Sequence, residues 1–188
     1  MGPRPRHDRL RDRLRDRPAH RAETPVISCL SGSEDDTLAI AAAIARLVRP
    51  GDVVLLAGEM GSGKTAFARG FAHGLGVAAD DHVASPTFNL VHVHDSGRVP
   101  LHHADLFRLQ TRGEIEDLGL REAADMGSVV LVEWGDAALD IFDEWLIVEI
   151  IDPDGGAMRT LEASVEGHRW DARWDRLCSA LGDWSGPA

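Results

Sequence analysis

The single lysine of this 188-residue chain lies in a segment with the spacing of a phosphate-binding loop. Residues 58–65 read Gly-Glu-Met-Gly-Ser-Gly-Lys-Thr and fit the pattern G-x-x-x-x-G-K-[ST]. In such a loop the glycines let successive backbone N–H groups point at phosphate oxygens. Lys64 would reach the β- and γ-phosphates of ATP, and the hydroxyl of Thr65 can bind Mg²⁺. The other 19 residues of the Lys and Arg class are all Arg, which fits a site that requires a compact ammonium group.

The segments on either side of this loop predict the strand, loop and helix that a phosphate-binding loop needs. Residues 52–57 form a short apolar run of strand type, and residues 66–75 carry Phe67, Phe71 and Leu75 at helical spacing. The alternative is an ordinary Gly-rich turn. The residues expected to bind the nucleotide here are Glu59, Met60, Gly61, Ser62, Gly63, Lys64, Thr65 and Ala66.

A second acid is expected at the tip of a neighbouring strand, where it would hold Mg²⁺ or a water bound to it. Glu133 is the best candidate, because the apolar run 129–132 precedes it and predicts a buried strand. The end of that strand would open at the same edge of the sheet as the loop. A surface Glu at a strand end is the alternative. Trp134 would either stack on the nucleotide or pack beside the strand.

The rest of the pattern predicts helices that alternate with buried strands. We expect an α/β protein with a P-loop NTPase-type three-layer fold, whose mixed, mostly parallel sheet includes antiparallel hairpin strands. Ser33 is the expected N-cap of the first helix, and Gly119 is expected to break a later one. The predicted strands are 25–30, 88–94, 99–105, 145–151 and 158–165, and the predicted later helices are 111–124 and 170–181.

Charge is divided unevenly along the chain. Residues 1–22 hold eight Arg and three Asp, a net charge of +5, whereas the remainder carries −16. We therefore predict a disordered basic tail over residues 1–24, either an arm that touches RNA or a solvated tail, and one ATPase domain over residues 25–184. The acidic domain is a poor candidate for binding nucleic acid through phosphate contacts on its own. No apolar stretch is long enough for a membrane span, and Cys29 and Cys178 lack metal-type spacing, so we expect a cytoplasmic protein with reduced thiols.

Four histidines lie close together in the sequence near two acids. His92, His94, His102 and His103 are dense enough to suggest a zinc site, but no His-Glu-x-x-His motif or Cys pair supports one. His103 is instead expected to hydrogen-bond near Asp105 and to fix that carboxylate.

Several sequence blocks together resemble the TsaE family (also called YjeE), bacterial ATPases involved in making threonylcarbamoyladenosine in tRNA. Besides the loop, the blocks that carry the resemblance are Glu34–Thr37, the strand before the loop, Ser85-Pro86-Thr87-Phe88, His103-Ala104-Asp105-Leu106-Phe107-Arg108-Leu109 and Glu133-Trp134. Departures from the family pattern include Glu59 in place of the usual Asp, and Gly135-Asp136 in place of Pro-Glu.

The resemblance implies roles for individual residues. Thr65 and Glu133 match the family's Mg²⁺ site, and Asp105 matches an acid needed for activity. Thr87 matches a switch-like loop close to the γ-phosphate, and Thr37 matches a position near the base or ribose. The block that contains Asp105 also makes Arg108 the best candidate for an arginine that stabilises charge at the γ-phosphate.

The resemblance further implies a function and partners. The chain would be an ATPase that acts with the TsaB–TsaD pair in tRNA modification. Because its residues supply no fast, preassembled hydrolytic site, we expect slow turnover by the isolated chain, and we expect that chain to be a monomer. Two alternatives stay open. One is a P-loop small-molecule kinase, although no Arg-rich lid is apparent after the loop helix. The other is a nucleotide-regulated assembly module in which hydrolysis is not required.

Overall fold

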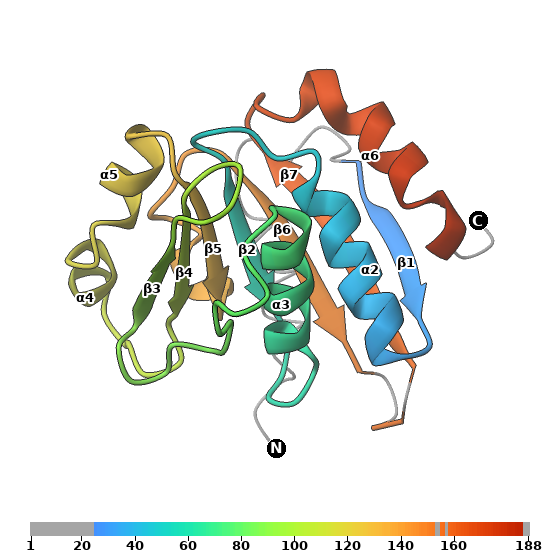
Figure 1. Cartoon of the computed structure of the whole chain (residues 1–188), viewed down its shortest axis with the longest axis horizontal. Helices are drawn as coiled ribbons and strands as arrows, with labels where there is room; N and C mark the ends of the chain where they lie inside the picture. Colours follow the sequence, from blue (N-terminus) through green and yellow to red (C-terminus); the bar gives the residue numbers. More distant parts are fainter. Residues whose placement is uncertain (1–24, 153–154, 157, 186–188) are drawn as a thin grey trace, which may run out of the picture.

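The computed structural model describes residues 25–152, 155–156 and 158–185, so the predicted basic tail lies outside the described residues. Figure 1 shows a central sheet with helices packed against it. In chain order the elements are β1 (Ile27–Ser31), α2 (Glu34–Ala45), β2 (Val53–Ala57), α3 (Lys64–Gly74), β3 (Val91–His94), β4 (Leu101–Asp105), α4 (Arg112–Glu116), α5 (Leu120–Asp125), β5 (Val129–Glu133), the 3-10 helix η2 (Gly135–Ala138), β6 (Trp145–Ile151), β7 (Arg159–Glu166), the 3-10 helix η3 (Asp171–Arg173), α6 (Trp174–Ala180) and the 3-10 helix η4 (Gly182–Trp184).

The seven strands of the described chain form one sheet in the order β1-β7-β6-β2-β5-β4-β3. The four central strands β6, β2, β5 and β4 are parallel to one another. Antiparallel pairing occurs at both edges, where β3 pairs with β4 and β7 pairs with β6 and β1. The predicted mixed sheet is therefore confirmed, and its parallel part is the central block that carries the phosphate-binding loop.

Helices cover both faces of the sheet, as the continuous apolar strands predicted. One apolar core joins α2, α3 and α6 to the sheet, with Phe67, Phe71 and Trp170 fully buried in it. A second core on the other face contains Ile115 of α4, Leu120 of α5 and the segment around η2. Every residue of β2 and β5 is buried, which is why these two strands read as unbroken apolar runs. The fold is the predicted three-layer arrangement.

Several expected boundaries are met and others shift. The Ser33 side chain accepts a hydrogen bond from the Asp36 backbone N–H at 3.1 Å and caps α2 as predicted. Gly119 has a φ of 66° and separates α4 from α5. The strand predicted over 88–94 begins only at Val91, because Leu90 has a φ of 63° and its N–H donates to the Pro86 carbonyl, which closes a turn. The last predicted helix begins as the 3-10 turn η3 and becomes α-helical at Trp174.

A buried ion pair fixes the start of the strand that leads to the loop. The guanidinium of Arg173 donates to both carboxylate oxygens of Asp52, at 2.5 and 3.0 Å, and both side chains are almost completely buried. The same guanidinium also donates to the backbone carbonyls of Leu47 and Arg169. The C-terminal segment is thereby tied to the beginning of β2.

Within the described residues, no helix is both long and apolar enough to cross a bilayer.

Candidate nucleotide-binding site

The loop between β2 and α3 has backbone conformations that favour glycine. Gly61 and Gly63 have φ values of 80° and 111°, and Gly63 is the N-cap of α3 without any side-chain cap. Gly58 has a φ of 140°, and a Cβ there would lie 2.4 Å from the Ile150 carbonyl oxygen. The first N–H groups of α3 are therefore available to an anion at the helix N-terminus, as a phosphate-binding loop requires.

Lys64 lies at the base of this loop with its side chain buried. Its Nζ donates to the carbonyl oxygens of Gly58 at 2.9 Å and Glu59 at 2.7 Å. The same Nζ lies 3.8 Å from the centroid of the Trp134 ring. The loop's own carbonyls thus hold the ammonium group at the cavity floor, where a phosphate would compete with them for its protons.

Thr65 and Glu133 come together although 68 residues separate them in the sequence. Leu56 of β2 is the register partner of Glu133 in β5, so the two strands end at the same edge of the sheet. The Thr65 hydroxyl donates to Glu133 Oε2 at 3.0 Å. The carboxylate of Glu133 thus faces the first turn of α3, beside the loop.

Asp105 ends the next strand and lies opposite Glu133 in the register of β4 and β5. Its Oδ2 accepts hydrogen bonds from the hydroxyls of Ser85 and of Thr87, the latter at 3.1 Å. Its Oδ1 accepts from the Phe107 backbone N–H at 2.9 Å. The loop that carries Ser85 and Thr87 is therefore fastened to the acid at the end of β4.

These groups surround a cavity of about 490 Å³, within the size range of small-molecule sites. Of the residues predicted for the site, those lining the cavity are Met60, Gly61, Gly63, Lys64, Thr65, Ala66, Thr87, Asp105, Glu133 and Trp134. The sequence reasoning did not place Arg69, Ser85 or Phe107 there, although all three line it. Arg69 lies one helical turn after Thr65, so helical spacing could have identified it. Ser85 and Phe107 belong to the blocks that carried the family resemblance.

Four predicted residues do not line the cavity. Glu59 contributes its backbone carbonyl to Lys64, and the side chain of Ser62 is buried within the loop. Thr37 is buried in the first turn of α2, where its hydroxyl lies 2.8 Å from the Ser31 hydroxyl. Arg108 is exposed, and its guanidinium lies 4.6 Å from the centroid of the Phe88 ring. The structure therefore does not bring Thr37 or Arg108 into the cavity.

The expected role of His103 beside Asp105 is corrected by the structure. His103 Nε2 lies 3.0 Å from Glu133 Oε1, so the histidine pairs with the other acid. The reason is geometric, because His103 and Glu133 are diagonal neighbours on one face of the sheet.

Burial lowers the pKa of His102 below its ordinary value. In the described part of the chain, no group of three His, Cys, Asp or Glu side chains is arranged to hold a metal ion.

The donor set beside the loop suits Mg²⁺ bound together with phosphates. Thr65, Glu133 and Asp105 offer only oxygen atoms, the ligands that Mg²⁺ prefers. The hydrogen bond between Thr65 Oγ1 and Glu133 Oε2 places two of these oxygen atoms side by side. Few protein ligands are needed, because Mg²⁺ at such sites keeps waters and binds the substrate phosphates.

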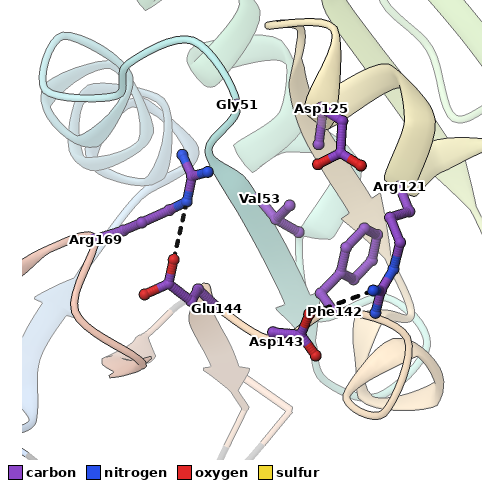
Figure 2. A pocket seen from close by; sticks show the side chains of 9 residues that line it. Gly51, Val53, Arg121, Asp125, Phe142, Asp143, Glu144 and Arg169 are labelled. Carbon is purple, nitrogen blue, oxygen red and sulfur yellow. Dashed lines mark hydrogen bonds and ion pairs between the residues drawn. The ribbon is translucent and has the colours of Figure 1, made fainter.

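A second, smaller cavity of about 110 Å³ lies at the other end of the parallel strands, where they begin (Figure 2). Its two arginines are held by acids, Arg169 by Glu144 at 3.1 Å and Arg121 by Asp143 at 3.3 Å. Figure 2 shows the two ion pairs on opposite sides of the hollow. Gly51 is the one glycine among the residues that line it, and no glycine-rich loop of the described chain leads into it, so the cavity at the phosphate-binding loop is the candidate functional site.

Comparisons with known proteins identify the family of the chain. The family described as Threonylcarbamoyl adenosine biosynthesis protein TsaE matches residues 31–160. A relative from Bacillus subtilis (strain 168), named tRNA threonylcarbamoyladenosine biosynthesis protein TsaE, is 36% identical over 147 residues, which cover 78% of this chain and 88% of the relative. A relative of the same name from Streptomyces coelicolor is 39% identical over 134 residues, covering 68% of this chain and 88% of the relative.

Similarity extends to a solved structure. A crystal structure of YdiB from Bacillus subtilis aligns with a TM-score of 0.67 and 28% sequence identity, covering 85% of this chain and 96% of that chain. The matched region 31–160 contains the phosphate-binding loop, Thr87, Asp105 and Glu133. The family resemblance predicted from the sequence blocks is confirmed, and the chain belongs to the TsaE family.

Proposed function

We propose that this protein binds ATP with Mg²⁺, hydrolyses it slowly, and serves the biosynthesis of threonylcarbamoyladenosine in tRNA. The observation that carries the proposal is the contact between Thr65 and Glu133 beside the loop, because it joins a phosphate-binding segment to an acid that can hold a metal. The names of the TsaE relatives support the biosynthetic role.

The residues of the cavity divide the work. Lys64 and the N–H groups at the start of α3 would bind the phosphates. Thr65 and Glu133 would hold Mg²⁺, which when bound neutralises charge on the phosphate oxygens. Asp105 lies beside Glu133 in register and would order the attacking water or a water of the metal shell. Arg69 adds a cation to the wall of the cavity.

Slow turnover follows from the contacts of Asp105. Its two oxygens already accept hydrogen bonds from Ser85, Thr87 and the Phe107 N–H. Three of the roughly four lone-pair sites of this carboxylate are thus occupied, so its capacity to orient a water is small unless one of these bonds exchanges. Arg108, the candidate for stabilising charge at the γ-phosphate, is stacked on Phe88 outside the cavity. The isolated chain therefore lacks a preassembled hydrolytic site.

The partners follow from the family. We propose that the chain acts in the cytoplasm as a monomer that docks on the TsaB–TsaD pair, and that docking completes the hydrolytic site. The net charge of −16 on the chain beyond residue 22 opposes contacts with tRNA phosphates, so the tRNA would be held by the partners.

A comparison of hydrolysis with tRNA modification tests the proposal. ATP hydrolysis would be measured for the chain alone and with TsaB–TsaD, and tRNA modification would be followed in parallel. We expect slow hydrolysis alone, faster hydrolysis with the pair, and loss of repeated modification in the Asp105→Ala variant. Normal modification by a variant that binds ATP but does not hydrolyse it would refute the role of hydrolysis and favour an assembly module. Consumption of ATP only with a small-molecule acceptor would favour a kinase.

A further inference from the structure

A fully buried histidine lies directly behind the acid of the proposed metal site. His103 is 0% exposed and Glu133 is 2% exposed. His103 Nε2 and Glu133 Oε1 are 3.0 Å apart, while the other carboxylate oxygen faces Thr65. The carboxylate is thus held from two sides, by a hydroxyl in front and an imidazole behind.

The sheet register accounts for this geometry. Leu131 is the register partner of His103, and Glu133 is the partner of Asp105. Side chains two positions apart on a strand share a face, so His103, Asp105 and Glu133 all point toward the side covered by α3. A diagonal pair on neighbouring strands is within reach of long side chains. The rigid centre of the sheet therefore sets the position of the imidazole.

The hydrogen-bond partners define which tautomer the histidine adopts. His103 Nδ1 is buried and has no hydrogen-bond partner among the described residues. Buried N–H groups without a partner are rarer in proteins than buried acceptors without one. In the tautomer that carries its proton on Nε2, the Nε2–H group donates to Glu133 and Nδ1 has no proton that needs an acceptor. We therefore assign this tautomer to His103.

We infer that His103 is a positioning residue for the metal site: its Nε2–H fixes Glu133 Oε1 so that Oε2 faces Thr65 and Mg²⁺. The inference rests on the proposed binding of ATP with Mg²⁺. Without the imidazole, Glu133 Oε1 lacks its donor, and of the two contacts described here the carboxylate keeps that with Thr65 alone. Loss of an outer-shell partner of this kind costs about 10- to 100-fold in metal affinity.

The test separates metal binding from nucleotide binding. The affinity for a non-hydrolysable ATP analogue would be measured in EDTA and across a Mg²⁺ titration, for the full chain and its variants. His103→Leu removes the donor, and His103→Gln restores an N–H near the position of Nε2. His94→Leu is the matched control, because His94 is 2% exposed and its ring lies 6.5 Å from that of His103. The paired group of His94 is Asp81, outside the cavity.

We expect His103→Leu to raise the Mg²⁺ concentration for half-maximal enhancement about 10- to 100-fold while leaving the affinity in EDTA within about twofold. His103→Gln is expected to recover most of the loss, and His94→Leu to match the wild type. Should His103→Leu not fold, His103→Asn carries the same expectation, because its amide is too short to reach Glu133.

Three results would overturn the inference. The first is a wild-type Mg²⁺ dependence in the variants without the donor. The second is an equal loss of affinity in EDTA and Mg²⁺, which marks a purely structural role. The third is an equal defect in the Gln and Leu variants. If the wild type itself binds the analogue without any Mg²⁺ effect, the proposed function fails together with this inference.

Discussion

Replacing Glu133 by Gln separates the charge of this residue from its shape. The amide keeps the size of the carboxylate, so its oxygen can still accept from His103 Nε2. Its NH₂ group then faces Thr65 Oγ1, and the Thr65 hydroxyl can turn to accept the bond instead of donating it. Both hydrogen bonds survive in the variant, but neither is assisted by a charge.

The magnitudes follow from this geometry. Two bonds that lose charge assistance reduce the free energy of unfolding by about 1–2 kcal/mol. For a chain of this size the Tm then falls by roughly 2–8 °C. The nucleotide responds differently, because removal of a negative charge beside the phosphates relieves repulsion. We expect the ATP affinity in EDTA to be unchanged or higher, while the gain in affinity from Mg²⁺ falls at least about tenfold.

Calorimetric titration with ATP, in EDTA and in Mg²⁺, checks both parts for folded protein. Glu144→Gln is the matched control, because Glu144 also accepts two hydrogen bonds, from the His168 N–H at 2.7 Å and Arg169 Nε at 3.1 Å. It lines the second cavity, where the parallel strands begin, and not the cavity at the loop (Figure 2). A Glu133→Gln variant that keeps the full Mg²⁺ enhancement would refute the metal role of Glu133, as would an equal loss in the Glu144→Gln control.

Three further predictions concern packing, ionisation and the cavity wall. Arg173→Met should lower the free energy of unfolding by about 3–5 kcal/mol, because the substitution leaves the Asp52 carboxylate buried without its main partner. Denaturant unfolding measures the loss, and a loss below about 1 kcal/mol would contradict the prediction. Burial raises the pKa of the Cys29 thiol to about 11. The thiol therefore ionises at lower pH in the unfolded chain than in the folded one, and the free energy of unfolding should fall as the pH rises from about 9 to 11. Cys29 should resist alkylation at pH 8 while exposed Cys178 reacts, and equal labelling rates would contradict the burial. Arg69→Ala should weaken ATP binding in EDTA and in Mg²⁺ by the same factor, whereas an effect confined to Mg²⁺ would show that Arg69 acts on the metal.

The sequence predicted most of the fold because its central strands are buried on both faces. The unbroken apolar runs that precede Gly58 and Glu133 correspond to β2 and β5. The turn at 86–90 was missed, since the left-handed conformation of Leu90 has no signal in its residue type. Gly119, in contrast, was a reliable signal because glycine adopts a positive φ without strain.

The candidate site was predictable where a motif fixes local geometry and less so where packing decides. Thr65 and Glu133 were paired correctly because the loop and the second acid must meet at one edge of a parallel sheet. The partner of His103 was assigned wrongly because the sequence does not reveal strand order or register, which decide whether Asp105 or Glu133 is within reach. Arg108 lies outside the cavity, against the ring of Phe88, a contact that its residue type does not reveal.

A crystal structure with Mg²⁺ and a non-hydrolysable ATP analogue tests the central claim most directly. We predict that the triphosphate lies in the loop at residues 58–65, with its phosphates against Lys64. The Mg²⁺ ion should bind Thr65 Oγ1 and the Glu133 carboxylate, directly or through one water. A metal ion that contacts neither side chain, or a nucleotide bound outside the loop, would contradict the account.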